Sequence, residues 1–174
     1  DDSGSYSVVV SNYLGSTTSS PAQVKISPAN YLSNLSVRAS MASGQTLIVG
    51  AVVSDGAKSI LARAAGPSLN QFGLSGLPDP RLELFGSSGT SLSSNDDWDS
   101  NLASVTRSVG AFAFNSNSRD AAILQSLSGA FTIQASGKDS TGTVLVEMYD
   151  TAGSSSPRLV NISARNQVGA GSDI

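Results

Sequence analysis

The densest group of side chains able to do chemistry lies between residues 95 and 99, where the sequence reads Asn-Asp-Asp-Trp-Asp. Calcium takes about six to eight oxygen ligands from carboxylates and carbonyls of a flexible loop. Asn95, Asp96, Asp97 and Asp99 offer part of such a set, and Asp120 is a further candidate from elsewhere in the chain. These residues form the candidate metal site, and calcium is the one cofactor considered. The alternative is that they end a strand and cap the following helix.

The rest of the sequence does not indicate catalytic chemistry. It contains no His and no Cys, which excludes Ser-His-Asp and Cys-His catalysis, disulfides and the usual zinc sites. Asp96 and Asp97 are adjacent, and adjacent residues of an extended chain point to opposite faces, so they cannot flank one bond as paired carboxylates. Each Lys lies by a strand or turn and is interpreted as a solvated surface charge: Lys25, Lys58 and Lys138. We therefore expect a protein that is not an enzyme.

Composition narrows the partners. The net charge is −3 and only 13% of the residues are charged, so no basic stripe is present for nucleic acid or for an anionic membrane surface. No apolar run approaches the ~20 residues of a membrane-spanning helix. We expect neither nucleic-acid binding nor membrane insertion.

Short apolar and β-branched runs alternate with Gly- and Ser-rich turns along the chain, which is typical of an all-β fold. We predict one β-sandwich or jelly-roll-like module with one short helix, at residues 100–110, covering an end of the sandwich. Asp55-Gly56 and Ser128-Gly129 are predicted to be turns between paired strands. Pro67 is expected to begin a short helical turn that ends at Gly73. Strands are predicted at residues 6–11, 22–26, 35–39, 46–53, 58–64, 81–85, 90–93, 120–127, 130–135 and 143–150.

One segment occurs twice. Residues 34–39 read Asn-Leu-Ser-Val-Arg-Ala, and residues 161–166 read Asn-Ile-Ser-Ala-Arg-Asn. The correspondence continues without a gap to Ile174, where an apolar strand equivalent to residues 47–53 would begin. The pattern predicts one full repeat and the start of a second.

Residues 2–6, Asp-Ser-Gly-Ser-Tyr, resemble the D-x-G-x-Y tyrosine corner of immunoglobulin-like domains. The strand pair that follows, with Gly15 at its turn, resembles the last two strands of the intermediate set of that family. Val8 stands where the family places a Cys, so the disulfide between its sheets is missing. The resemblance implies that residues 1–27 are the C-terminal strands of such a domain, whose earlier strands would precede residue 1.

A second resemblance covers the remainder. Residues 80–97 look like the start of bacterial pre-peptidase C-terminal-type sandwiches, and residues 127–150 look like their closing strands. The stretch 35–165 is similar to repeat modules of very large secreted bacterial proteins. Gly86 and Phe131 are departures, standing where Asp and Tyr are common. The resemblance implies an extracellular, non-enzymatic module, secreted or on the bacterial cell surface.

The expected organisation follows: residues 1–27 close an immunoglobulin-like domain, 28–31 are a linker, 32–152 are the sandwich module, and 153–174 are a linker and the first strand of the next repeat. Unpaired strand edges recruit strands from other chains. We therefore expect a structural module of a repetitive surface protein or filament, whose partners are copies of itself or flanking modules, with residues 158–174 as the donated strand. The alternative is an adhesion or substrate-targeting module that binds a polysaccharide or protein fibre in a groove rimmed by Trp98, Tyr149 or Tyr31. Trp98 itself is interpreted first as an anchor of the core or its rim.

Overall fold

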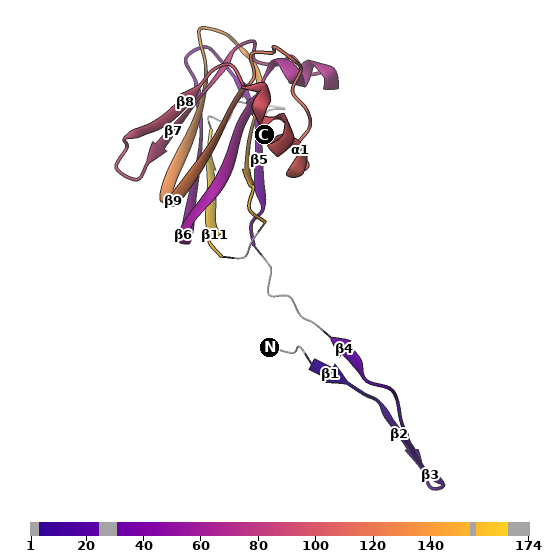
Figure 1. Ribbon diagram of the computed structural model, residues 1–174. Helices are drawn as coiled ribbons and strands as arrows, with labels where there is room; N and C mark the ends of the chain where they lie inside the picture. Colours follow the sequence, from indigo (N-terminus) through magenta and orange to yellow (C-terminus); the bar gives the residue numbers. More distant parts are fainter. Residues whose placement is uncertain (1–3, 25–30, 154–155, 167–174) are drawn as a thin grey trace. The chain divides into compact units, whose positions relative to one another are not determined.

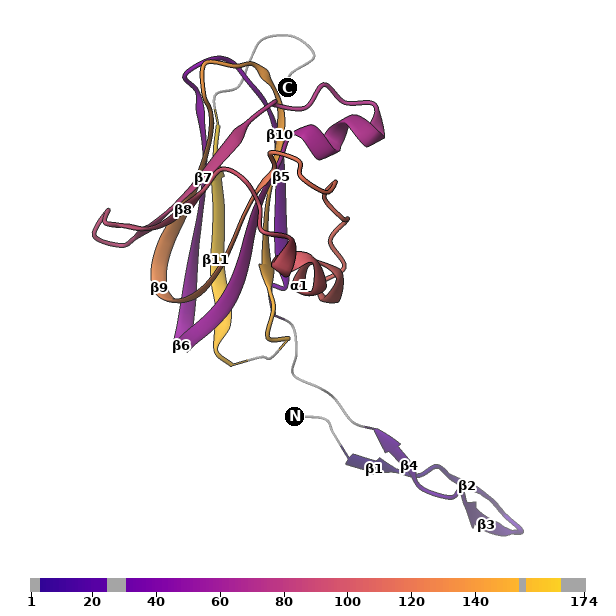
Figure 2. The same ribbon diagram turned by 45° about the horizontal axis from the view of Figure 1, so that its top comes forward.

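The computed structural model describes residues 4–24, 31–153 and 156–166. The chain divides into two compact units, Asp1–Asn30 and Tyr31–Ile174, whose strands are labelled in Figures 1 and 2. Most of the predicted linker 28–31, and the tail 167–174 with its continuation of the repeat, lie outside the described residues.

The first unit is a two-stranded antiparallel hairpin. β2 (Val9–Asn12) pairs with β3 (Gly15–Thr18), and β1 (Gly4–Tyr6) pairs with β4 (Ala22–Val24). At the turn, the backbone N–H of Leu14 donates to the side-chain oxygen of Asn12, an Asx-type contact that stabilises chain reversal. The predicted turn is confirmed, and the predicted strands are confirmed in part, because 6–11 is divided between β1 and β2 and β3 was not predicted. Val9 and Val10 are exposed because a lone hairpin has no covered face. Such a hairpin is marginally stable in water.

The second unit contains one seven-stranded sheet with the order β5-β10-β6-β9-β7-β8 and with β11 also paired to β6. All its strand pairs are antiparallel. Figures 1 and 2 show the long strands folding over so that the sheet faces itself. The fold is all-β, as predicted. Its strands are β5 (Asn34–Met41), β6 (Thr46–Ala65), β7 (Pro80–Gly86), β8 (Ser91–Asn95), β9 (Ala121–Gly137), β10 (Gly142–Asp150) and β11 (Arg158–Arg165).

Two predicted turns were wrong. β6 and β9 run through Asp55-Gly56 and Ser128-Gly129 without reversing, and they pair with each other on both sides of these points. Asp55, Gly56 and Gly129 do have positive φ angles. They are used in a bulge, in which four residues of β6 stand opposite one residue of β9 between the pairs Val53–Gly129 and Lys58–Leu127. A bulge bends the strand, so the first half of β6 carries β11 on its other edge and the second half carries β10.

The bulge also changes which residues of β6 face the core. Before it, Leu47 and Val49 are buried in the alternating pattern, and after it Ile60 and Ala62 are. The parity of the inward face therefore switches from odd to even residues. The result is one continuous core, to which β5, β6, β7, β9, β10 and β11 all contribute.

The outer face of the second half of β6 is covered by the chain between β8 and β9. This segment contains η2 (Ser100–Leu102) and α1 (Ala103–Ser108), which confirms the predicted helix. Leu102 and Phe114 pack with Ala65 and Leu145 in a second cluster. The segment therefore covers a face of the sheet, whereas the sequence predicted that it would cover an end of the sandwich. No helix in the described part of the chain has the length and apolar character needed to span a bilayer.

The short helix before β7 follows the local sequence. Pro67 begins η1 (Pro67–Phe72) and Gly73, with φ 76°, ends it in the left-handed conformation. Both were predicted from residue type, because Pro favours the first turn of a helix and Gly favours the position after its end.

Candidate functional site

The predicted metal cluster lies where β8 leads into η2. The Asn95 side chain accepts a hydrogen bond from the N–H of Ala122 and donates one to the carbonyl of Asp97. Asp99 is the N-cap of η2, since its carboxylate accepts from the N–H of Asn101 at 2.8 Å. Asn95 therefore ends strand β8, and Asp99 caps the helix η2.

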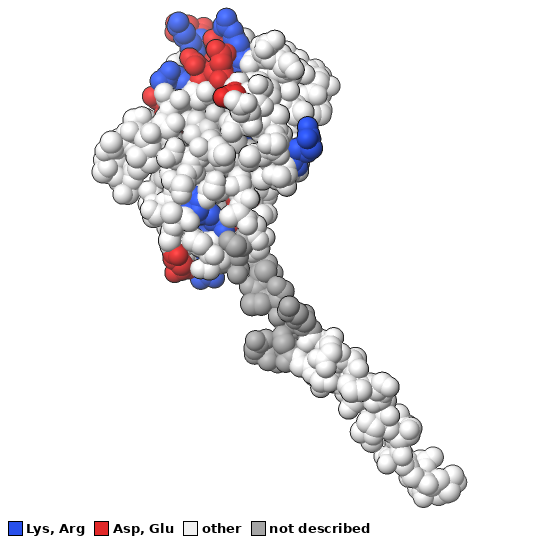
Figure 3. Space-filling model, viewed as in Figure 1, with Lys and Arg blue, Asp and Glu red and all other residues white. Residues whose placement is uncertain are grey.

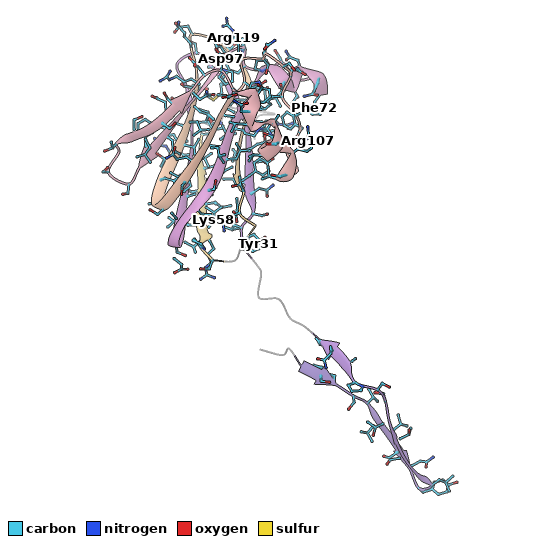
Figure 4. All side chains as sticks on the ribbon, in the orientation of Figure 1. Tyr31, Lys58, Phe72, Asp97, Arg107 and Arg119 are labelled. Atoms are coloured by element: carbon cyan, nitrogen blue, oxygen red, sulfur yellow. The ribbon has the colours of Figure 1, made fainter. Side chains whose placement is uncertain are left out.

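Asp96 and Asp97 are exposed. In Figure 3 acidic and basic side chains gather at the upper end of the second unit, and Figure 4 labels Asp97 and Arg119 there. Arg119 forms an exposed ion pair with Asp79, with Nη1 and Oδ2 2.9 Å apart. Within the described ranges, no three acidic side chains come close enough together to hold a metal ion.

Asp120 does not join this cluster through its side chain. Its carboxylate is fully buried and accepts hydrogen bonds from the N–H groups of Gly66 and Ser68 and from the hydroxyls of Ser68 and Ser118. Only its backbone carbonyl reaches toward the cluster, where it accepts from the N–H of Trp98. Asp120 therefore holds the loop that opens η1 against the start of β9.

This geometry predicts the effect of Asp99→Ala. Loss of the cap should lower the free energy of unfolding by about 1 kcal/mol, measured by urea denaturation without added calcium. An unchanged stability in Asp99→Ala would contradict the capping role.

The calcium hypothesis makes a separate prediction. Added Ca²⁺ should raise the unfolding temperature, and Asp96→Asn together with Asp97→Asn should abolish the rise.

The three aromatic residues proposed to rim a groove do not lie together. Trp98 packs edge-on against Phe114, with ring centroids 5.6 Å apart, as expected of an anchor at the core rim. Tyr149 lines an open hollow of about 230 Å³ at the base of β5 and β10. Tyr31 lies beside this hollow, where its hydroxyl donates to the carbonyl of Gly153. The hollow is lined by Ser33, Asn34, Ser108, Val109, Tyr149, Asp150, Thr151 and Gly153.

A buried cation that the sequence did not single out lies under residues 96–120, the chain between β8 and β9, which we call the cover segment. The Arg63 guanidinium lies against two rings, 3.9 Å from the centroid of Phe114 and 4.7 Å from that of Phe112. It pairs with Glu147, whose other carboxylate oxygen accepts from the Tyr149 hydroxyl at 2.6 Å. Burial lowers the pKa of Arg63, and the Glu147 carboxylate offsets part of that effect. Burial, and then the hydrogen bond to Glu147, raise the pKa of the Tyr149 phenol above its ordinary value.

The interpretation of Lys58 as a solvated charge was wrong. Its ammonium lies 2.9 Å from the Asp150 carboxylate, and both side chains are fully buried. It also donates to the carbonyl of Pro157 and faces the ring of Tyr31 at 5.9 Å from the centroid. Lys138 is exposed, as expected, and Lys25 lies outside the described residues. The available signal was parity, because Lys58 shares the inward face of β6 with Ile60.

The second copy of the repeated segment is the edge strand β11. It pairs with residues 48–54 of β6 in the sheet of its own unit. We had expected this strand to be unpaired within its own chain, and that expectation was wrong. Leu159 is buried and Ile162 is half-buried against the core, while the other side chains from 158 to 165 are exposed. Gly50 lies directly opposite Ser163. The structure thus shows a seat for this segment on a sheet edge, built from backbone pairing and one main apolar anchor.

A comparison with models of known protein families gives no match, and neither does one with curated protein sequences. The two resemblances therefore remain hypotheses. The features of this chain that bear on its function are the strand edge, the buried ion pairs and the repeated segment.

Proposed function

We propose that this chain is a non-enzymatic structural module of an extracellular repetitive surface protein or filament, in which modules or subunits are joined by strand complementation. The observation that carries the proposal is the place of the repeated segment. The copy at 158–165 is an edge strand held mainly by backbone pairing to β6. Added strands gain affinity from main-chain hydrogen bonds and specificity from pockets for alternate side chains. In β11 the backbone pairing with β6 supplies the first, and the buried side chain of Leu159 supplies the second.

Two further features support the proposal. The segment occurs twice in the sequence, which fits a protein built from consecutive similar modules. The first unit is a lone hairpin with Val8, Val9 and Val10 exposed, and such a hairpin needs further strands to cover it. Flanking modules or neighbouring copies of this chain are the partners that would supply those strands.

The test is negative-stain electron microscopy of the native material without denaturation, together with its intact mass. We expect regular fibres whose subunit has about the 17.6 kDa mass of this chain, or modules of this kind repeated within a longer chain that assembles. Dispersed particles with no repeat along them would contradict a structural role in assembly.

A second function is adhesion to a polysaccharide or protein fibre. The observation that favours it is the open hollow beside Tyr149, which Ser33, Asn34, Ser108 and Thr151 line with polar groups. Dispersed particles in the microscope would favour this function over the first.

A further inference from the structure

β11 is held on β6 by few side-chain contacts. It pairs with β6 across an irregularity after Leu159, and Leu159 is its only fully buried apolar side chain. Burying one Leu side chain contributes about 1.5–3 kcal/mol. Little side-chain burial therefore has to be lost for β11 to leave β6.

The seat of β11 on β6 has a specific shape. A Cβ atom added to Gly50 would lie 2.8 Å from the Ser163 hydroxyl oxygen, and its next neighbours would be 3.9 Å away. Positions 50 and 163 are therefore in close contact across the strand pair, and a side chain at position 50 would displace only the Ser163 hydroxyl, the end of a rotatable side chain. Leu32 and Leu159, which occupy the same position in the two copies, meet in an isolated antiparallel bridge where β11 begins.

The chain leading into β11 is fastened at the same point. Lys58 pairs with Asp150 at the end of β10 and donates to the carbonyl of Pro157, the residue before β11. Asp150 in turn accepts from the N–H of Ala152. We call Lys58, Asp150 and Pro157 the latch. It lies with Tyr31 at the end of the second unit opposite Asp97 and Arg119 (Figure 4).

We propose that the edge of β6 from Ile48 to Ser54 is an acceptor site for the 158–165 strand of a second copy of this chain, and that the latch sets whether the strand is kept or exchanged. The inference rests on the proposed function and deepens it by naming the acceptor edge and its control. An exchanged strand makes the same contacts with β6 as the chain's own strand, so the two states differ mainly in which copy supplies the strand. The chain's own strand has an effective concentration of about 1 mM, and the latch favours it further.

The experiment mixes two full-length variants, Gly50→Cys and Ser163→Cys. The natural chain has no cysteine, so each variant carries one, and a disulfide between positions 50 and 163 forms only between copies. Directly opposite residues of an antiparallel pair are close enough for a disulfide. We expect a mixed dimer under mild oxidation, identified by mass spectrometry of the linked peptides.

The latch is tested by adding Lys58→Met with Asp150→Asn to both variants. This pair of changes removes the ammonium and the carboxylate together, so no lone buried charge remains. We expect the yield of the mixed dimer to rise about tenfold, because the changes remove the charged hydrogen bond from Lys58 to the Pro157 carbonyl, which holds the start of the chain's own strand. Resistance to tryptic cleavage at Arg63, the one tryptic site that these variants keep within β6, confirms that the sheet stays folded.

The control mixes Gly50→Cys with Ser94→Cys, which places the cysteine on the exposed edge strand β8. A 50–163 yield no higher than this control overturns the acceptor site, and an unchanged yield in the latch variants overturns the latch. Fibres in the native material together with a control-level 50–163 yield would leave the proposed function standing and reject only this route of assembly. The reverse result would support strand exchange and reject the filament.

Discussion

Replacing Asp120 by Ala is expected to lower the free energy of unfolding of the second unit by about 3–5 kcal/mol. The side chain is fully buried and is the acceptor for four donors, two backbone N–H groups and two hydroxyls. Without it, the donors of Gly66, Ser68 and Ser118 lose their acceptor, and each group that stays buried and unsatisfied costs its desolvation. Urea denaturation followed by Trp98 fluorescence measures the change.

The matched control is Asp79→Ala. Asp79 is likewise an aspartate with a close partner, since it forms an ion pair with Arg119, but the Arg119 side chain is 67% exposed. Exposed pairs contribute little because water screens them and ordering costs entropy, so the change should stay below about 0.5 kcal/mol. Hydrogen exchange adds a second readout: the amides of η1 should lose protection in Asp120→Ala and keep it in Asp79→Ala. Equal stabilities of the two variants would show that the Asp120 contacts do not stabilise the fold.

The parts of the fold that the sequence predicted well are those fixed by local rules. The strand predicted at 143–150 appears as β10 and that at 81–85 as part of β7, because alternating apolar side chains have one arrangement that buries them. Pro67 and Gly73 set the ends of η1 through backbone geometry alone. None of these features depends on a distant residue.

The bends in β6 and β9 could not be read in the same way. Asp55-Gly56 supplies positive φ angles, and such angles suit a hairpin turn and a bulge equally. The choice depends on which strands are available as partners. Here β9 is long enough to pair with both halves of β6, and this partner lies more than sixty residues further along the sequence.

The buried charges were missed for a related reason. Lys58 and Arg63 look like solvated charges unless their partners are known, and Asp150 and Glu147 follow about ninety residues later. A charged residue is rarely buried unless it is paired. By contrast, the acidic residues 95–99 stood out because they are adjacent, although Asn95 and Asp99 cap and terminate local structure. Adjacency in sequence signals local structure as readily as a binding site.

The second large effect is expected from Arg63→Met. The variant leaves Glu147 buried with no cation, and removing one partner of a buried pair costs about 3–5 kcal/mol. It also removes the guanidinium from its contacts with Phe112 and Phe114, and these two cation–π contacts contribute about 1–2 kcal/mol more. Lys in its place would keep the charge but lose the planar contact with both rings. Thermal and urea unfolding of the two variants measure the loss.

A double-mutant cycle separates the ion pair from the packing. Glu147→Gln in the Arg63→Met background removes the lone charge while the amide oxygen still accepts from Tyr149, so the double variant should recover at least about 1–2 kcal/mol relative to Arg63→Met. The same cycle on Arg81 and Glu83 is the comparison, because their side chains are 46% and 36% exposed. Its coupling should stay near or below about 0.5 kcal/mol. A coupling at Arg63 and Glu147 as small as the exposed one would mean that the carboxylate does not hold Arg63 in place. The contacts with Phe112 and Phe114, which include the hydrogen bond from Arg63 to the Phe112 carbonyl, would then be what holds it.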